Sequence, residues 1–259
     1  MDMGIKGKRA LVCASSKGLG RGCAKALAAE GVNLVINARS DGPLQKTAEN
    51  IRSMYGVEVI AVAADITKKS DREEVLAVAG DLDILVTNAG GPPPGMWHEW
   101  EREDFIAAFD ANMLTPVALM KSVLPGMMAR GWGRIINITS VSVKAPIAVL
   151  GLSNSARAGL TGYVAGTARQ VAHAGVTINN ILPGFHDTDR ASAIDAVTAD
   201  AEGIDVAEAK KRRCAAIPAG RYGSTAEFGA MCLFLCSQHA GYIVGQNILL
   251  DGGADNSLM

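Results

Sequence analysis

Short runs of apolar residues alternate along the chain with longer stretches whose apolar positions recur every three or four residues. The short runs predict buried strands, and the longer periodic stretches predict amphipathic helices. The predicted strands cover residues 9–13, 33–37, 57–63, 84–87, 134–138, 177–182 and 247–250. The predicted helices cover residues 21–30, 43–55, 70–79, 103–130, 153–174 and 226–237. This alternation indicates the α/β class, with a doubly wound parallel sheet that carries helices on both faces.

Two segments depart from this alternation of strands and helices. Residues 191–213 are rich in Ala, Asp and Lys and predict a helical insertion. We expect the wider segment 185–222 to form a lid over a site at the edge of the sheet. Pro116 and Pro125 interrupt the long predicted helix, because proline cannot donate a backbone hydrogen bond. No repeat or linker divides the chain, so we expect residues 1–259 to form one domain.

The composition argues against several classes of protein. Of 259 residues, 49% are hydrophobic, and the mean hydropathy is +0.17, which is enough for a sizeable core. A net charge of −1 gives no global attraction to nucleic acid or to a membrane. The chain has no apolar run long enough to span a bilayer, and its first residues lack the apolar core of a signal peptide. We therefore expect a cytoplasmic protein without nucleic-acid or membrane partners.

The five cysteines predict no metal site. Their number is odd, and no pair has metal-ligand spacing beside a histidine cluster. They are Cys13, Cys23, Cys214, Cys232 and Cys236. The last two lie four residues apart in an apolar helical stretch, which is typical of buried free thiols.

A Gly-rich segment joins the first predicted strand to the first predicted helix. It reads Cys-Ala-Ser-Ser-Lys-Gly-Leu-Gly from residue 13 to residue 20. Such a junction suits a pyrophosphate, because the backbone can approach closely and the helix N-terminus offers unpaired N–H groups. The candidate residues for this contact are Ser15, Ser16, Lys17, Gly18, Leu19 and Gly20. The alternative is a Gly-rich loop that binds no ligand.

The end of the second predicted strand bears on the choice of nucleotide. Dinucleotide-binding folds usually place an acidic residue there, which bonds the ribose hydroxyls of NAD. This chain has Ala38, followed by Arg39 and Ser40, and Lys17 lies in the Gly-rich turn. Two cations and no carboxylate favour a 2′-phosphate, and hence NADP(H). The alternative is that both cations are ordinary solvated surface groups.

Candidate ligand-binding residues also follow three further predicted strands, at the carboxyl ends where open α/β sheets bind ligands. They are Asp65 and Ile66 after the third strand, Asn88, Ala89 and Gly90 after the fourth, and Ser140 after the fifth. For Asp65 the alternative is a cap on the helix that follows.

These motifs together resemble those of the short-chain dehydrogenase/reductase family, and in particular its fatty-acid ketoreductase-like branch. Gly18 and Gly20 match the family motif TGxxxGxG, with Ala14 in place of its first Gly. Residues 87–90 match its NNAG motif with one change, and residues 245–253 match its closing GQxxxxDGG motif. The resemblance spans nearly the whole chain. It implies a Rossmann-type fold, hydride transfer with a nicotinamide cofactor, and a homo-oligomer, either a tetramer or a dimer.

The resemblance also implies roles at the cofactor. Asp65 matches the family residue that contacts adenine. The segment that begins with Pro183 and Gly184 matches a PGxxxT motif, in which Thr188 would bond the nicotinamide carboxamide. The alternative for this segment is a plain turn at the end of a strand.

At the catalytic end the chain departs from the family. Ser140 matches a serine that bonds the substrate carbonyl, and Asn112 matches an asparagine that holds a proton-relay water, although a solvent-facing helix residue is its alternative. The family then places a Tyr and a Lys four residues apart. This chain has Ser153 and Arg157 there. The spacing keeps both on one helix face, and Arg157 can still bond the ribose and hold positive charge.

A serine hydroxyl is a much weaker acid than a tyrosine beside a cation, so the source of the proton is open. Ser140, Ser153 and a water could relay it. His186 or Asp187 could supply it from the predicted lid. The reaction could also be one that needs no tyrosine, such as reduction of a conjugated double bond. Tyr163 is no substitute, because it lies on another helix face.

The leading hypothesis is therefore an NADP(H)-dependent oxidoreductase that acts on a small carbonyl or alcohol substrate. A second hypothesis is an NADP(H)-binding homologue with little or no turnover, and a third is a tyrosine-independent enoyl-type reductase. Trp97 and Trp100 lie near the same edge of the sheet. They either wall a substrate pocket or anchor the loop that carries them.

Overall fold

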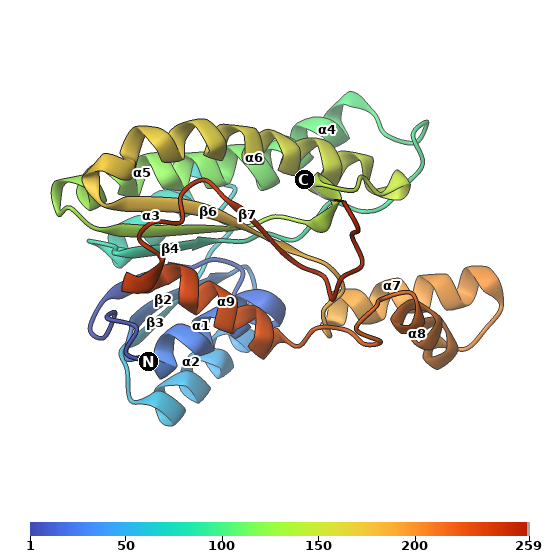
Figure 1. Ribbon diagram of the computed structural model, residues 1–259, viewed down its shortest axis with the longest axis horizontal. Helices are drawn as coiled ribbons and strands as arrows, with labels where there is room; N and C mark the ends of the chain where they lie inside the picture. The colour runs from blue at the N-terminus through green and yellow to red at the C-terminus, as the bar shows by residue number, and fades with distance from the viewer. Residues whose placement is uncertain (258–259) are drawn as a thin grey trace.

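The fold is built on one sheet of seven parallel strands, described by a computed structural model for residues 1–257. The strand order is β3-β2-β1-β4-β5-β6-β7 (Figure 1). The strands are β1 Arg9–Val12, β2 Asn33–Ala38, β3 Val59–Ala63, β4 Ile84–Thr87, β5 Gly133–Ile138, β6 Val176–Pro183 and β7 Asn247–Leu250. The predicted α/β class with a doubly wound parallel sheet is confirmed. Because the strand order reverses between β1 and β4, a crevice for ligands is expected beyond their carboxyl ends.

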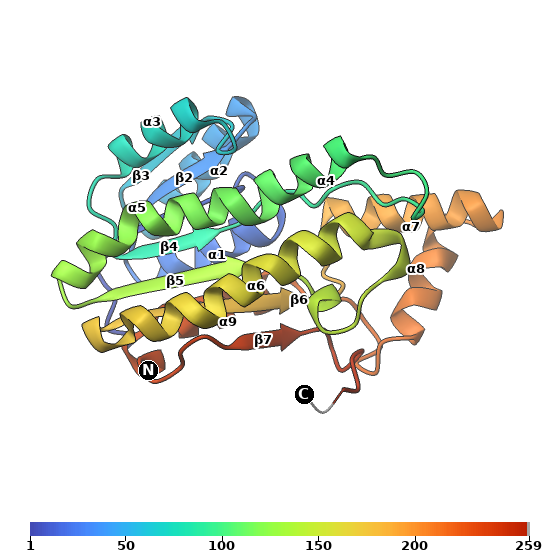
Figure 2. The same ribbon diagram turned by 90° about the horizontal axis from the view of Figure 1, so that it is seen from above.

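Helices cover both faces of the sheet. The helices are α1 Gly18–Ala29, α2 Asp41–Tyr55, α3 Lys69–Ala79, α4 Arg102–Phe109, α5 Thr115–Ala129, α6 Gly151–Val171, α7 Asp189–Glu202, α8 Val206–Ala215 and α9 Thr225–Cys236. α1, α2 and α9 pack on one face, and α3, α5 and α6 pack on the other (Figures 1 and 2).

The apolar strands contribute side chains to the core on both faces of the sheet, because successive side chains of a strand point to opposite sides. Ala10 and Val12 pack against the α1, α2 and α9 layer, whereas Leu11 and Cys13 pack against the α3, α5 and α6 layer. Burial on both sides explains why the strands are apolar without alternation. The two clusters of buried apolar side chains hold the strand ends in fixed positions.

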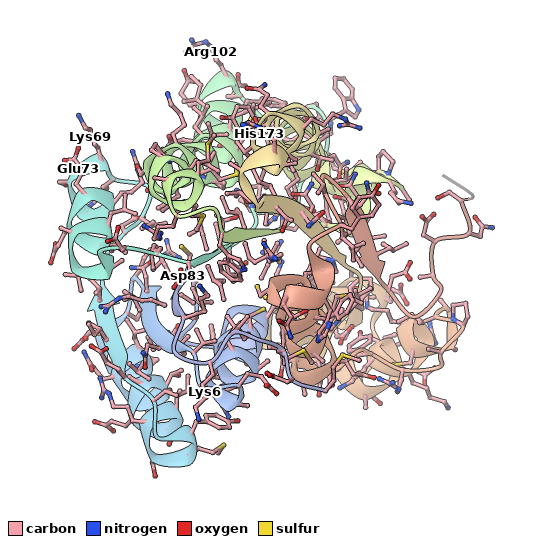
Figure 3. All side chains as sticks on the ribbon, turned by 60° about the vertical axis from the view of Figure 1, so that its left-hand side comes forward. Lys6, Lys69, Glu73, Asp83, Arg102 and His173 are labelled. Atoms are coloured by element: carbon pink, nitrogen blue, oxygen red, sulfur yellow. The ribbon has the colours of Figure 1, made fainter. Side chains whose placement is uncertain are left out.

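Charged side chains lie mostly outside these layers. Figure 3 shows Lys69 and Glu73 on the outer side of α3, where their charged groups are 3.7 Å apart, and Arg102 at the start of α4. Asp83 lies at the amino end of β4, and its carboxylate accepts hydrogen bonds from the Arg9 backbone (3.0 Å) and the Lys8 ammonium (3.4 Å). None of the helices within residues 1–257 is long and apolar enough to span a bilayer.

The long predicted helix is interrupted differently from expectation. The chain forms α4, then a π-helical turn at Asp110–Leu114, then α5. The break precedes Pro116, whereas Pro125 lies inside α5. Because Pro116 has no N–H, the α-helical hydrogen bond to the Asn112 carbonyl cannot form. In the π-helical turn before it, the Thr115 N–H bonds the carbonyl of Asp110, five residues back.

The predicted helical insertion consists of two helices, α7 and α8. Gly203 ends α7 with a positive φ of 65°, a conformation that favours glycine. The pair projects beyond the carboxyl edge of the sheet (Figure 1). The buried carboxylate of Asp195 ties the helices together, because it accepts hydrogen bonds from Arg213 Nε (2.8 Å) and from the Tyr222 hydroxyl (2.7 Å).

Candidate functional site

The Gly-rich turn after β1 forms a narrow backbone cradle. Gly18 has φ +58°. A side chain at Gly20 would press against the Ala14 carbonyl and lie 3.0 Å from Asn88 Nδ2. Asn88 Nδ2 itself donates to the Ala14 carbonyl (3.4 Å) and so joins the end of β4 to the turn. The cradle therefore needs glycine at residue 20, and Ala14 maintains the turn with φ 47°.

Side chains of the turn are partly committed to structural hydrogen bonds. The buried Ser15 hydroxyl donates to the carbonyls of Val12 (2.9 Å) and Asn37 (3.3 Å). The Ser16 carbonyl accepts from Thr47 Oγ1 (2.9 Å), and Leu19 packs on the core. The groups that remain for a phosphate are the N–H groups at the start of α1, which begins at Gly18.

The cations predicted to select a 2′-phosphate lie at the surface. Arg39 and Ser40 are exposed after β2. Within residues 1–257 Arg39 forms no salt bridge. Lys17 is also exposed, and its ammonium lies 2.9 Å from the carboxylate of Asp189 at the start of α7. The Lys17–Asp189 pair links the Gly-rich turn to the helical insertion.

Asp65 forms a turn rather than the cap of α3. Its Oδ1 accepts hydrogen bonds from the Thr67 backbone (3.2 Å) and the Thr67 hydroxyl (2.8 Å), whereas the N-cap of α3 is Lys68. The adjacent Ile66 is buried. The Asp65 N–H donates to Asp71 (3.0 Å), and this bond lowers the pKa of the Asp71 carboxyl. The carboxylate of Asp65 thus holds its own loop at the end of β3.

Ser153 and Arg157 form a hydrogen-bonded pair on α6 beside the end of β5. Arg157 Nε donates to Ser153 Oγ (3.2 Å), and Nη1 donates to the carbonyls of Ile138 (2.8 Å) and Thr139 (3.0 Å). Ser140 follows directly, and its Oγ accepts from the Ser142 N–H (3.1 Å). The guanidinium therefore ties α6 to the strand end that carries Ser140.

Arg157 stays charged although it is buried. Burial, together with the nearby charge of Arg190, lowers the pKa of its guanidinium to about 10. Because this value is well above neutrality, a permanent cation lies within the site.

Asn112 lies in the π-helical turn and faces a cleft. Its Nδ2 donates to the Ala108 carbonyl (3.4 Å), but its buried Oδ1 has no partner among residues 1–257. The cleft measures about 160 Å³ and is lined by Gly90, Gly91, Pro92, Pro93, Asp104, Ala107, Ala108, Asn112 and Leu152. An orphaned acceptor at such a place suits a bound water or a ligand hydroxyl. The solvent-facing alternative for Asn112 is wrong, because the residue is 3% exposed.

His186 and Asp187 are engaged away from this cleft. The buried His186 ring packs edge-on against Phe228 with ring centres 5.3 Å apart, and its Nδ1 lies 3.2 Å from the Gly184 carbonyl. Burial lowers the pKa of this imidazole. Asp187 accepts a hydrogen bond from the Lys210 ammonium (3.0 Å). These contacts make both residues poor candidates for the proton donor.

Thr188 lies over the Gly-rich turn. Its Cγ2 is 3.7 Å from the position that a Cβ on Gly18 would occupy. Its hydroxyl donates to the His186 carbonyl (3.3 Å) and accepts from the Ala191 N–H (3.4 Å), which caps α7. Pro183 ends β6, and Gly184 packs closely against Asp251. The fold therefore brings the segment after β6 next to the segment after β1.

The two tryptophans differ in role. Trp100 packs against Gly151 at the start of α6 and joins a small apolar cluster with Leu152 and Ala156. Because of this packing, Trp100 anchors the loop that carries it. Trp97, in contrast, is 81% exposed.

Arg190 is a residue of this site that sequence reasoning missed. From the first turn of α7 its guanidinium donates to the carbonyls of Gly91 (3.2 Å) and Pro92 (3.5 Å) in the cleft wall. Nothing in the local sequence distinguishes Arg190 from an ordinary surface cation, because these partners lie almost a hundred residues away.

The strand order, the Gly-rich cradle after β1 and the polar residues at the carboxyl edge define a Rossmann-type nucleotide-binding protein. The family described as enoyl-(acyl carrier protein) reductase matches residues 13–255. The chain belongs to the short-chain dehydrogenase/reductase family, as its motifs predicted.

Curated relatives match along almost their full length. D-β-hydroxybutyrate dehydrogenase of Cupriavidus necator is 34% identical over 254 residues, with 96% of this chain and 98% of that protein covered. The 3-oxoacyl-(acyl-carrier-protein) reductase FabG of Vibrio cholerae is 32% identical, with 97% and 98% covered. Among solved structures, L-sorbose reductase from Gluconobacter frateurii complexed with NADPH and L-sorbose superposes with a TM-score of 0.95 at 30% identity, and both chains are covered completely.

Proposed function

We propose that this protein is an NADP(H)-dependent oxidoreductase that transfers hydride between the cofactor and a small carbonyl or alcohol substrate. The observation that carries the proposal is that Ser140, Ser153 and Arg157 lie together at the end of β5, on the same carboxyl edge of the sheet as the Gly-rich cradle after β1. The printed names of the relatives support it, since they include a hydroxybutyrate dehydrogenase, 3-oxoacyl reductases and a sorbose reductase complexed with NADPH.

The residues present fit NADP(H). N–H groups of residues 15–20 would meet the pyrophosphate, and Lys17, Arg39 and Ser40 would meet the 2′-phosphate. Further cofactor contacts are proposed for Asp65 and Ile66 at the adenine end, for Asn88, Ala89 and Gly90 in the middle, and for Pro183, Gly184 and Thr188 at the nicotinamide end. When bound, the cofactor would supply or accept the hydride.

The chain's own residues would bind the substrate oxygen and transfer its proton. We propose that Ser140 donates a hydrogen bond to the substrate oxygen and that Ser153 and Arg157 stand where the family has its Tyr and Lys. Because Ser153 Oγ accepts the Nε–H of Arg157, its own O–H is left to donate to a substrate oxygen. The same charged donor stabilises negative charge on Ser153 Oγ, and a water held by Asn112 Oδ1 would return the proton.

The test is an absorbance assay of NADPH oxidation with short oxo acids, ketoses and enones. Turnover is expected, and Ser140→Ala should lower kcat by about 10²–10³-fold, as loss of one donor to a developing oxyanion does elsewhere. NADPH affinity should not change in this variant. Ser122→Ala, on the exposed side of α5, is the matched control and should keep full activity. Turnover that survives Ser140→Ala unchanged contradicts the proposed site.

The same assay separates two further candidates. The family description as enoyl reductase and the serine at position 153, where the family has its Tyr, favour a tyrosine-independent enoyl reduction, which would consume enones but not ketones. A weak or inactive NADP(H)-binding homologue would bind NADPH without turnover of any compound. We also propose that residues 185–222 form a lid on a single domain, and that the protein is a cytoplasmic homo-oligomer, either a tetramer or a dimer.

A further inference from the structure

The start of α7 lies over the Gly-rich turn that follows β1. Asp189 is the first residue of α7, and its carboxylate lies 2.9 Å from the ammonium of Lys17, 172 residues back in the chain. Beside this pair, Thr188 lies above Gly18, since its Cγ2 is 3.7 Å from the position that a Cβ on Gly18 would occupy. The chain segment that leads into α7 is therefore in contact with the turn that is proposed to bind the cofactor.

The position of Asp189 does not depend on Lys17 alone. The next residue, Arg190, donates to the carbonyls of Gly91 (3.2 Å) and Pro92 (3.5 Å) in the loop after β4. The first turn of α7 thus contacts the segments after β1 and after β4, the two strands between which the strand order reverses. A carboxylate is also favoured at the N-terminus of a helix by the helix dipole. The fold therefore holds the Asp189 carboxylate beside the Gly-rich turn.

The backbone of Lys17 follows the part of the turn that contacts β2 and α2. The Ser15 hydroxyl donates to the carbonyl of Asn37 (3.3 Å) on β2, and the Ser16 carbonyl accepts a hydrogen bond from Thr47 (2.9 Å) on α2. The residues proposed to bind the 2′-phosphate lie between β2 and α2 in the sequence. The backbone of Lys17 is therefore next to a segment that contacts the neighbourhood of the 2′-phosphate site, whereas its ammonium lies against α7.

The Lys17–Asp189 pair is open to solvent and can be exchanged for another pair. The two side chains are 67% and 74% exposed, and an ion pair with this exposure contributes little to the stability of a fold. The hydrogen bond from Lys17 holds the pKa of the Asp189 carboxyl below its ordinary value, so the carboxylate is charged at neutral pH. A phosphate group that reaches the Lys17 ammonium therefore replaces one anion by another.

A second exposed ion pair of the same region provides a comparison. The Asp187 carboxylate lies 3.0 Å from the Lys210 ammonium, and the side chains are 64% and 45% exposed. Both residues belong to the predicted lid, residues 185–222, so this pair connects the lid only with itself. The Lys17–Asp189 pair connects the lid with a residue that is proposed to bind the cofactor. Of the two pairs, only Lys17–Asp189 sets a carboxylate against the cofactor.

We propose that Asp189 is a specificity-determining residue, whose carboxylate competes with the 2′-phosphate of NADP(H) for the ammonium of Lys17. This inference rests on the proposed function, because it concerns the same cofactor site. The ammonium that bonds Asp189 is not free for the phosphate, so NADP(H) gains the Lys17 contact only when the pair separates. NAD(H) has no 2′-phosphate and leaves the pair intact. Asp189 therefore reduces the preference of the protein for NADP(H) over NAD(H).

The test is a fluorescence titration of the wild type and of Asp189→Asn with NADPH and with NADH. The substitution removes the charge and keeps the size of the side chain. NADPH binding should tighten by about two- to fivefold, the range expected for loss of one exposed ion pair, and NADH binding should not change. Asp187→Asn, which removes the carboxylate of the comparison pair, is the matched control and should change the binding of neither cofactor.

A double-mutant cycle with Lys17→Gln shows whether the effect passes through Lys17. In the Lys17→Gln background, Asp189→Asn should no longer tighten NADPH binding, because nothing remains to compete for. Three results overturn the inference and leave the proposed function standing: unchanged or weaker NADPH binding in Asp189→Asn, equal tightening of both cofactors, or a gain that persists in Lys17→Gln. Absence of NADPH binding in both the wild type and Asp189→Asn would defeat the proposed function, and this inference with it.

Discussion

Ala14 holds a backbone conformation that residues with a side chain rarely adopt. Its φ is 47°, and a left-handed conformation costs roughly 1–2 kcal/mol for a residue other than glycine. Its carbonyl accepts the hydrogen bond of Asn88 and closes the cradle over Gly20. The turn therefore keeps its shape at the expense of local strain.

Ala14→Gly is expected to stabilise the protein by about 0.5–1 kcal/mol, because relief of strain exceeds the entropy that glycine loses on folding. Urea denaturation measures the change. The matched control is Ala196→Gly in the exposed middle of α7, where the same substitution should destabilise by about 1 kcal/mol. Loss of stability in Ala14→Gly of similar size to the control would contradict the strain.

Arg39 is the single residue on which the choice of NADP(H) most depends. Arg39→Ala should weaken NADPH binding by about 2 kcal/mol, because a charged partner of the 2′-phosphate is lost, and should hardly change NADH binding. Fluorescence titration with each cofactor measures this. Lys46→Ala removes another exposed cation, on α2, and should affect neither cofactor. Equally weakened binding of both cofactors in Arg39→Ala would show that Arg39 does not bind the 2′-phosphate.

At the scale of elements, the sequence predicted where helices and strands exist better than how helices are interrupted. Periodicity located α6 and β5 to within a few residues. It did not show that the long helix changes to a π-helical turn at Asp110–Leu114, because a proline indicates only that a helix is interrupted and not in which form. Asn112 lies in this turn and is buried.

The α7–α8 pair depends on a small set of contacts. Asp195 is 1% exposed and bonds Arg213 and Tyr222. Tyr222 also belongs to a small apolar cluster with Ala191 and Ile217. Asp195→Ala should leave a partly buried arginine without its partner, which typically costs about 3 kcal/mol.

The expected result of Asp195→Ala is faster amide exchange in α7 and α8, with unchanged protection in the central strands, because the pair can open locally. Hydrogen–deuterium exchange with mass spectrometry measures it. Asp200→Ala, at an exposed position of α7, is the control and should exchange like the wild type. Uniform loss of protection over the whole chain would mean that the pair is not an independent unit.

At the scale of the whole molecule, His186 couples stability to pH. It joins the segment after β6 to α9 through Phe228. Burial lowers the pKa of its imidazole, although the Gly184 carbonyl and Glu227 oppose the shift. The folded state therefore binds this proton less readily than the unfolded state. The corresponding stability is present above the unfolded pKa of about 6.5 and is lost as the pH falls through the folded value.

His186→Asn should accordingly reduce the loss of Tm between about pH 7.5 and about pH 5.5 relative to the wild type. Thermal unfolding followed by circular dichroism at both pH values measures the difference. The same change at the exposed His98 should leave the loss of Tm unchanged. An identical pH response in wild type and His186→Asn would exclude His186 as the cause.

The sequence by itself determined the α/β class, the approximate positions of the strands and the family, because burial on two faces leaves continuous apolar runs and a phosphate cradle needs glycine at fixed spacing. It also indicated Ser140, Ser153 and Arg157, which lie near one another as expected. Only the tertiary structure decided what these residues contact. Arg157 binds carbonyls at the end of β5, Lys17 pairs with Asp189, and Arg190 reaches the wall of the cleft. Such contacts join residues far apart in the chain, and local periodicity carries no information about them.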